Sequence, residues 1–118
     1  MRNVTLLDGV DASSQQISTA ENLDKRTEWK LLINSSGLDG IPQLFIEQGF
    51  NGGKCFGEPN EWSVLTNKCD DTGVFLIDDA IITVNASSFK GNWFRVRLEA
   101  NGNTTGTVTA RLGYKDFP

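Results

Sequence analysis

The clearest pattern near the end of the chain is a strict alternation of apolar and polar side chains. In the first run, Phe94, Val96, Leu98 and Ala100 alternate with Trp93, Arg95, Arg97 and Glu99. In the second run, Val108, Ala110, Leu112 and Tyr114 alternate with Thr107, Thr109, Arg111 and Lys115. A period of two is typical of a strand with one buried face. Because Asn101-Gly102-Asn103 separates the runs, the sequence predicts an antiparallel β-hairpin whose arginines and threonines face solvent.

Shorter runs with the same period recur through the rest of the chain. The firmest of them, residues 27–34, places Trp29, Leu31 and Ile33 on one face. Further strands are expected at 3–7, with Asp8-Gly9 as a turn, and at 17–20, 43–48, 62–66, 74–77 and 81–84. The charged residues 21–26 are too few for a packing helix.

The spacing of these runs indicates the class of fold. Turn residues separate them at intervals of about eight to twelve residues, as in sandwiches and barrels. The 118 residues suffice for one domain with a two-layer core. Twelve glycines and a single methionine favour a turn-rich β chain. We therefore expect one domain, residues 1–118, folded as an all-β antiparallel β-sandwich. It would be jelly-roll-like, with about eight or nine strands and no packing helix.

Charge and hydropathy argue against two classes of partner. The net charge is −4 and the basic residues are scattered, whereas nucleic-acid binding needs clustered Lys and Arg. The longest apolar runs, of about four residues, are too short to span a membrane. Residues 1–12 contain no apolar stretch of signal-peptide length, so we expect the chain to be made and kept in a cytoplasm.

The two cysteines, Cys55 and Cys69, are interpreted as free thiols in a reducing compartment, with a disulfide as the alternative. Without histidine they cannot complete a standard zinc site, which needs four nitrogen or sulfur ligands. The lack of histidine also excludes Ser–His and Cys–His nucleophile pairs.

The remaining candidates for chemistry are paired aspartates. Asp70-Asp71 and Asp78-Asp79 flank residues 74–77, so their carboxylates could converge on a Ca²⁺ ion. The spacing of a calcium loop is missing, and solvated turn aspartates are the favoured interpretation. We expect no catalytic residue, no cofactor and no metal, and hence no enzyme.

Aromatic residues supply the candidate interaction surface. Residues 49–60 form the longest segment without periodicity and contain four glycines, with Phe50 and Phe56 inside it and Trp62 close behind. Trp93 is out of phase with the apolar positions of its run, so it should face outward. Such aromatics either anchor a protein interface or stack on sugars, and a loop packed on itself is the third possibility. A second candidate surface is the first strand, with Val4 and Leu6.

Several segments together carry a family resemblance. They are VTLLDGVDA at 4–12, SSGLDG followed by PQLFIE at 35–47, WSVL at 62–65, and the closing WFRVRL, NGNTTG and TVTARL. In these segments the chain resembles the small β-sandwich virion proteins of tailed bacteriophages, which serve as head decoration, neck, collar or tail accessory proteins. The long loop at 49–60 and the two cysteines depart from that layout.

The resemblance implies a non-enzymatic structural protein located in the virion and assembled in the host cytoplasm. Its partners would be capsid, neck or tail subunits, and it would be a homo-oligomer or bound to a lattice. The resemblance transfers no site residue. The alternative function is a carbohydrate-binding or adhesive module that uses Trp62 and Trp93 as stacking platforms.

Overall fold

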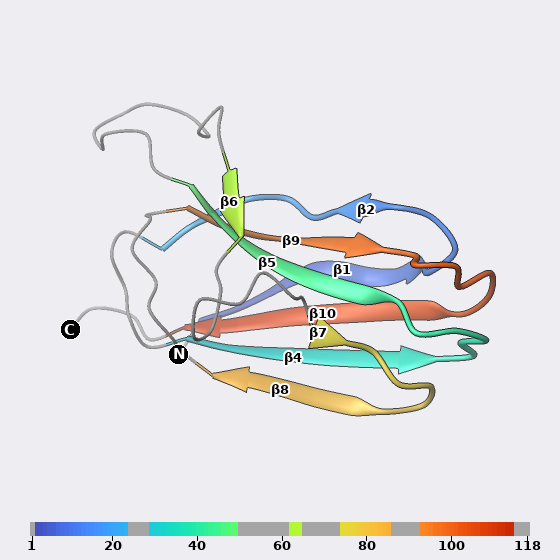
Figure 1. The fold of residues 1–118 in the computed structure, drawn as a ribbon. Helices are drawn as coiled ribbons and strands as arrows, with labels where there is room; N and C mark the ends of the chain where they lie inside the picture. The colour runs from blue at the N-terminus through green and yellow to red at the C-terminus, as the bar shows by residue number, and fades with distance from the viewer. Residues whose placement is uncertain (1, 24–28, 50–61, 65–73, 86–92, 115–118) are drawn as a thin grey trace.

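The fold is an antiparallel β-sandwich, as predicted. The computed structural model describes residues 2–23, 29–49, 62–64, 74–85 and 93–114. Their ten strand segments are β1 (Arg2–Asp11), β2 (Gln16–Ile17), β3 (Glu21–Asn22), β4 (Trp29–Ser36), β5 (Gln43–Gly49), β6 (Trp62–Val64), β7 (Val74–Phe75), β8 (Ile81–Asn85), β9 (Trp93–Glu99) and β10 (Thr107–Tyr114). They form two packed sheets, in the orders β1-β10-β4-β8 and β2-β9-β5-β6 (Figure 1). The described residues contain no helix that could cross a membrane.

The strand pairings give the connectivity of a jelly roll. β2 and β3 both pair with β9, and β6 and β7 both pair with β5, so each couple acts as one interrupted strand. Ser18 bridges the first interruption, because its Oγ accepts the Val96 N–H at 3.0 Å. In the resulting eight-strand chain, the first strand pairs with the last, the second with the seventh, the third with the sixth and the fourth with the fifth.

The predicted hairpin of β9 and β10 is wrong. β9 pairs with β5, β2 and β3, whereas β10 lies in the other sheet between β1 and β4. A buried face with a period of two satisfies either arrangement, because the alternation fixes which side faces the core and not which strand lies alongside. The connection between the strands crosses from one sheet to the other instead of closing a tight turn.

The predicted turn at Asp8-Gly9 is also wrong, because β1 continues through it to Asp11. The register against β10 shifts between Thr5 and Leu7 and again between Leu7 and Val10. Gly9 takes a φ of 57°, which glycine adopts without strain, so the dipeptide forms a β-bulge.

The core lies between the sheets and contains the apolar faces that the alternation predicts. Trp29, Leu31 and Ile33 of β4 are buried, and Trp29 meets Phe94 of β9 edge to face with ring centroids 5.1 Å apart. That contact joins the two sheets. Of the described residues, the largest fully buried side chains are Phe94, Leu23, Leu31, Ile33, Leu44, Leu76, Leu98, Leu112, Val96, Val108 and Pro42.

Candidate functional site

The outer surface of the β2-β9-β5-β6 sheet carries a dense set of charged and aromatic side chains. Cross-strand register places Glu47 opposite Arg95 and Phe45 opposite Arg97, on the face that points away from the core. We call the group formed by Phe45, Glu47, Trp62, Arg95, Arg97 and Glu99 the arginine face.

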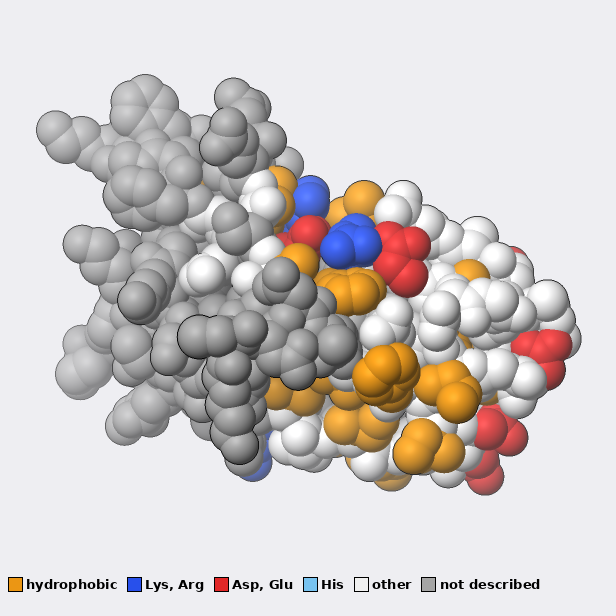
Figure 2. Space-filling view, viewed as in Figure 1, with side chains coloured by type: hydrophobic (Ala, Val, Ile, Leu, Met, Phe, Trp, Pro, Cys, Tyr) orange, Lys and Arg blue, Asp and Glu red, His pale blue; other side chains and the backbone are white. Residues whose placement is uncertain are grey.

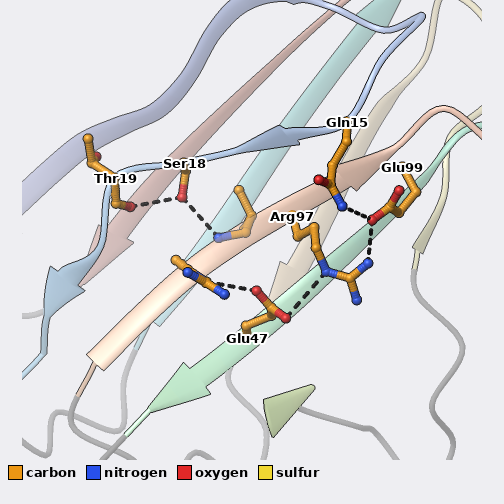
Figure 3. Close-up of polar contacts among 8 residues, drawn as sticks. Gln15, Ser18, Thr19, Glu47, Arg97 and Glu99 are labelled. Atoms are coloured by element: carbon orange, nitrogen blue, oxygen red, sulfur yellow. Dashed lines mark hydrogen bonds and ion pairs between the residues drawn. The ribbon is translucent and has the colours of Figure 1, made fainter. Parts of the chain in front are cut away.

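Glu47 is the centre of the arginine face. Its Oε1 accepts from Arg95 Nε at 2.8 Å and its Oε2 pairs with Arg97 Nε at 3.3 Å (Figure 3). The Glu47 side chain is only 7% exposed, whereas the two arginine side chains are 22% and 24% exposed. A buried carboxylate is costly unless it is paired, and here two guanidinium groups pair it.

Each arginine also covers an aromatic ring. The Arg95 guanidinium lies 4.2 Å from the ring centroid of Trp62, and that of Arg97 lies 4.5 Å from the centroid of Phe45. Both distances fall within the range of cation–π attraction. The two guanidinium groups are therefore held by carboxylates and rings of the same face.

Hydrogen bonds on this face favour the ionised form of Glu99. Gln15 Nε2 donates to Glu99 Oε1 at 2.6 Å, and together with Arg97 this bond lowers the pKa of Glu99 (Figure 3). Burial opposes the charge of Arg97, but Glu99 and Glu47 outweigh it and raise the pKa of Arg97. A general acid needs a raised carboxyl pKa, so Glu99 has the opposite tuning.

The two tryptophans of the predicted interaction surface lie at the end of this sheet. Trp62 of β6 and Trp93 of β9 are half-buried, and both pair in register with Gly49 of β5. Trp93 is on the outer side, as its phase predicts. Phe50 and Phe56, together with the rest of the loop at 50–60, lie outside the described residues.

The second predicted surface, on β1, is only partly at the surface. Val4 is half-buried and packs against the core, and Leu6 is 6% exposed. Leu6 and Leu7 are both buried because the register shift after Thr5 breaks the alternation. Leu6 is therefore a core residue, and its side chain is not accessible to a binding partner.

Of the four aspartates considered for calcium, only the second pair lies in the described chain. Asp78 Oδ1 accepts the N–H of Leu38 at 2.8 Å, so this carboxylate fixes a loop. Asp70, Asp71, Cys55 and Cys69 lie outside the described residues. Within the ranges that the structure covers, no three Asp, Glu, Cys or His side chains lie close enough to hold a metal ion.

Sequence reasoning missed an exposed apolar patch beside β7. Ile41, Phe75 and Ile77 are 55%, 51% and 65% exposed. Gln43 pairs with Phe75 and Leu76 N–H donates to Pro42 O at 2.9 Å, so Ile41 and Ile77 each follow directly on this paired stretch. We call Ile41, Phe75 and Ile77 the β7 patch. Figure 2 shows hydrophobic side chains gathered over β7 and β8, below the charged arginine face.

A cavity lies on the outer side of the other sheet, near the start of β8. Its volume is about 320 Å³, and polar and apolar atoms contribute about equally to its lining. The lining residues are Asn34, Ser35, Ser36, Asp79, Ala80, Ile81, Thr107 and Thr109. Oδ1 of Asn34 is buried there and has no hydrogen-bond partner. The cavity has no aromatic platform, so it lacks the usual element of sugar stacking.

Comparisons with protein-family models, curated proteins and solved structures gave no match to this chain.

Proposed function

We propose that this chain is a non-enzymatic structural subunit of a tailed-phage virion, docking on the capsid, neck or tail lattice through the β7 patch. The observation that carries the proposal is the patch itself. Three large apolar side chains, each more than half exposed, come from β7 and from the residues just outside the paired ends of β5 and β7. A contiguous exposed apolar surface marks an interaction site more often than scattered single residues do.

Two further observations support a virion role. The jelly-roll connectivity is an architecture that viral capsid domains use, although lectins and cupins use it too. The closing segments WFRVRL and TVTARL, which carry the resemblance to phage virion sandwiches, form β9 and β10.

The β7 patch is small, so it suits a weak contact that is repeated many times in a lattice. Burying the exposed half of one large apolar side chain contributes about 1 kcal/mol, so three contribute about 3 kcal/mol before the cost of association. That gain is small for an isolated pair of proteins. A symmetric lattice presents the same interface many times, and linked copies bind far more tightly than single ones.

The test is the composition of virus particles purified from cells that carry the phage encoding this chain. Mass spectrometry should find the chain in the particles. Phe75→Ser combined with Ile77→Ser should lower its incorporation about thirty-fold, because it removes two of the three side chains and hence about 2 kcal/mol. Ile17→Ser is the matched control, because Ile17 is 49% exposed on the opposite edge of the same sheet. Particles without the chain, or normal incorporation of the double variant, would refute the proposal.

One observation favours carbohydrate binding as a second candidate. Trp62 and Trp93 are both in register with Gly49, which places no side chain between them. Aromatic pairs spaced in this way can stack on sugar rings, although Arg95 already covers one side of Trp62. Tryptophan fluorescence titrated with polysaccharides separates the two functions. Quenching that Trp93→Ala abolishes would favour the module, and indifference to every polysaccharide would favour the structural subunit.

A further inference from the structure

The four sheet edges of the described chain differ in how well they are protected from pairing with another strand. β2 and β3 have two residues each, and β6 and β7 have three and two. β1 is long, but it carries Asp8 and Asp11 and two register shifts. Short length, charge and bulges are the devices by which proteins block edge-to-edge pairing.

β8 has none of these protections. Its five residues, Ile-Ile-Thr-Val-Asn, include no charge and no proline, and they pair with β4 in an unbroken register. In the described part of the chain no strand pairs with its other side, and Figure 1 shows β8 as the outermost strand of its sheet. Strands with high β-propensity and no charge are the ones that accept a partner strand.

The backbone groups that β8 turns outward can be identified. Ser35 N–H donates to Ala80 O at 3.2 Å, one step beyond the Asn34–Ile81 pair. Antiparallel residues alternate between pairs that exchange hydrogen bonds and pairs that do not. Ile82 and Val84 therefore turn their backbone groups toward β4, whereas those of residues 81, 83 and 85 point to the open edge.

That edge is complementary to itself. A two-fold axis through Thr83 places residue 83 opposite its own copy and residue 81 opposite residue 85, which matches every outward backbone group with a partner. On the inner face, Ile82 of one copy then lies opposite Val84 of the other. Both side chains are half-buried against the core, so pairing would bury more of their apolar surface. Thr83 facing Thr83 is a favourable cross-strand pair.

We infer that β8 is the site at which a second copy of this chain binds, by antiparallel pairing about a two-fold axis at Thr83. The occupant is a second copy because the edge matches itself residue for residue. Because β8 carries no charge, two chains of net charge −4 can pair along it without bringing like charges together within the strand. The two β1-β10-β4-β8 sheets become one continuous sheet. This dimer does not depend on the proposed function, because a chain absent from virions would still pair in this way.

The test is the mass of the purified chain in solution. Light scattering after size exclusion should give twice the mass of one chain for the wild type. Thr83→Lys should weaken the dimer about ten-fold or more, because two ammonium groups then meet at the axis. Asn3→Lys is the matched control, since it adds the same charge at an exposed position on the opposite edge of the same sheet. It should leave the dimer intact.

Hydrogen exchange locates the contact independently of charge. The amides of Ile81 and Thr83 should exchange slowly at high protein concentration and fast on dilution or in Thr83→Lys. A wild-type monomer at every concentration would overturn the inference. A dimer that tolerates Thr83→Lys and leaves both amides fast would overturn it as well.

Discussion

Asn103 is the residue on which the loops at one end of the sandwich converge. Its Oδ1 accepts the N–H groups of Asp39 at 3.0 Å and Gly40 at 2.9 Å. Its Nδ2 donates to the carbonyls of Ala12 at 3.0 Å and Thr105 at 2.6 Å. Asn103 is 2% exposed, and one amide thereby ties three separate loops together.

Asn103→Ala should lower the free energy of unfolding by about 2–4 kcal/mol, because the change leaves backbone groups of three loops without partners in a buried place. Urea denaturation followed by tryptophan fluorescence measures the change. Asn3→Ala, the same substitution at an exposed position on β1, should alter stability by less than about 0.5 kcal/mol. Equal losses for the two variants would contradict the role assigned to Asn103.

Acid should destabilise the fold through carboxylates whose pKa folding lowers. Hydrogen bonds from the Thr104 side chain and backbone lower the pKa of Asp39 below its ordinary 3.8, and the bond from Gln15 lowers that of Glu99 below 4.5. A depressed pKa stabilises the folded state at pH values above the ordinary one. That contribution is lost as the pH falls through the ordinary value toward the lowered one.

The melting temperature should therefore stay level near neutral pH and fall once the pH drops below 4.5. Asp39→Asn should be less stable than wild type at pH 7 and should approach it as the pH falls below 3.8, where the wild-type carboxyl is also losing its charge. A difference between the two proteins that stays constant from pH 7 to acid would contradict this linkage.

At the level of single residues, the sequence predicted which apolar side chains face the core. It did not predict which polar side chains are buried or what they bind. Glu47 alternates with the core residues Leu44 and Ile46, yet it is 6% exposed. Two arginines of β9, a strand far away in sequence, cover it. Asn103 occurs in a segment with the composition of a turn, and only the folded loops give it four hydrogen-bond partners.

At the level of elements, Gly106 marks the point where the chain crosses from β9's sheet to β10. Its φ is 96°, and a Cβ there would lie 2.6 Å from the carbonyl oxygen of Ser36 and 2.7 Å from the carbonyl carbon of Gly37. Gly102 also has a positive φ, 84°, but a Cβ on it would meet nothing within 4 Å. Substitutions at the two glycines therefore distinguish the cost of backbone strain, which both share, from the cost of a steric clash, which only Gly106 adds.

Gly106→Ala should cost about 3 kcal/mol or more, because it adds a clash with the backbone to the strain of a left-handed residue. Gly102→Ala should cost about 1 kcal/mol, from the strain alone. Thermal and urea unfolding of both variants measures the difference. If the two substitutions cost the same, the close approach of residues 106 and 36 is not part of the fold.

The longer strands could be predicted from the sequence, but which strands pair could not. The strand expected at 17–20 is wrong, because the structure has β2 at Gln16–Ile17 and β3 at Glu21–Asn22, within the charged segment. The buried faces of β4, β5, β9 and β10 match the alternation. The pairing of β9 with β5 and of β10 with β1 and β4 brings distant segments together, and the pattern of a single strand carries no information about its neighbour. The bulge in β1 was missed for a related reason, since Asp8-Gly9 has the composition of a turn.

At the level of the whole molecule, the large exposed apolar residues that the structure describes lie mainly on one side of the sandwich. β7 and β8 are consecutive in the chain and form neighbouring edges of the two sheets, and Ile41, Phe75, Ile77 and Ile81 are each more than half exposed there. The sequence motif VFLI predicted a strand. The side on which Phe75 and Ile77 face follows only from the pairing with β5. The candidate surface thus depends on tertiary pairing that the sequence alone did not reveal.

The proposed function is docking of the β7 patch on neighbouring subunits of a virion. A cryo-electron microscopy map of the particle tests it most directly. We expect density for the sandwich with Ile41, Phe75 and Ile77 buried against an adjacent subunit in every copy. A particle without this density, or one in which these three side chains face solvent in all copies, would contradict it.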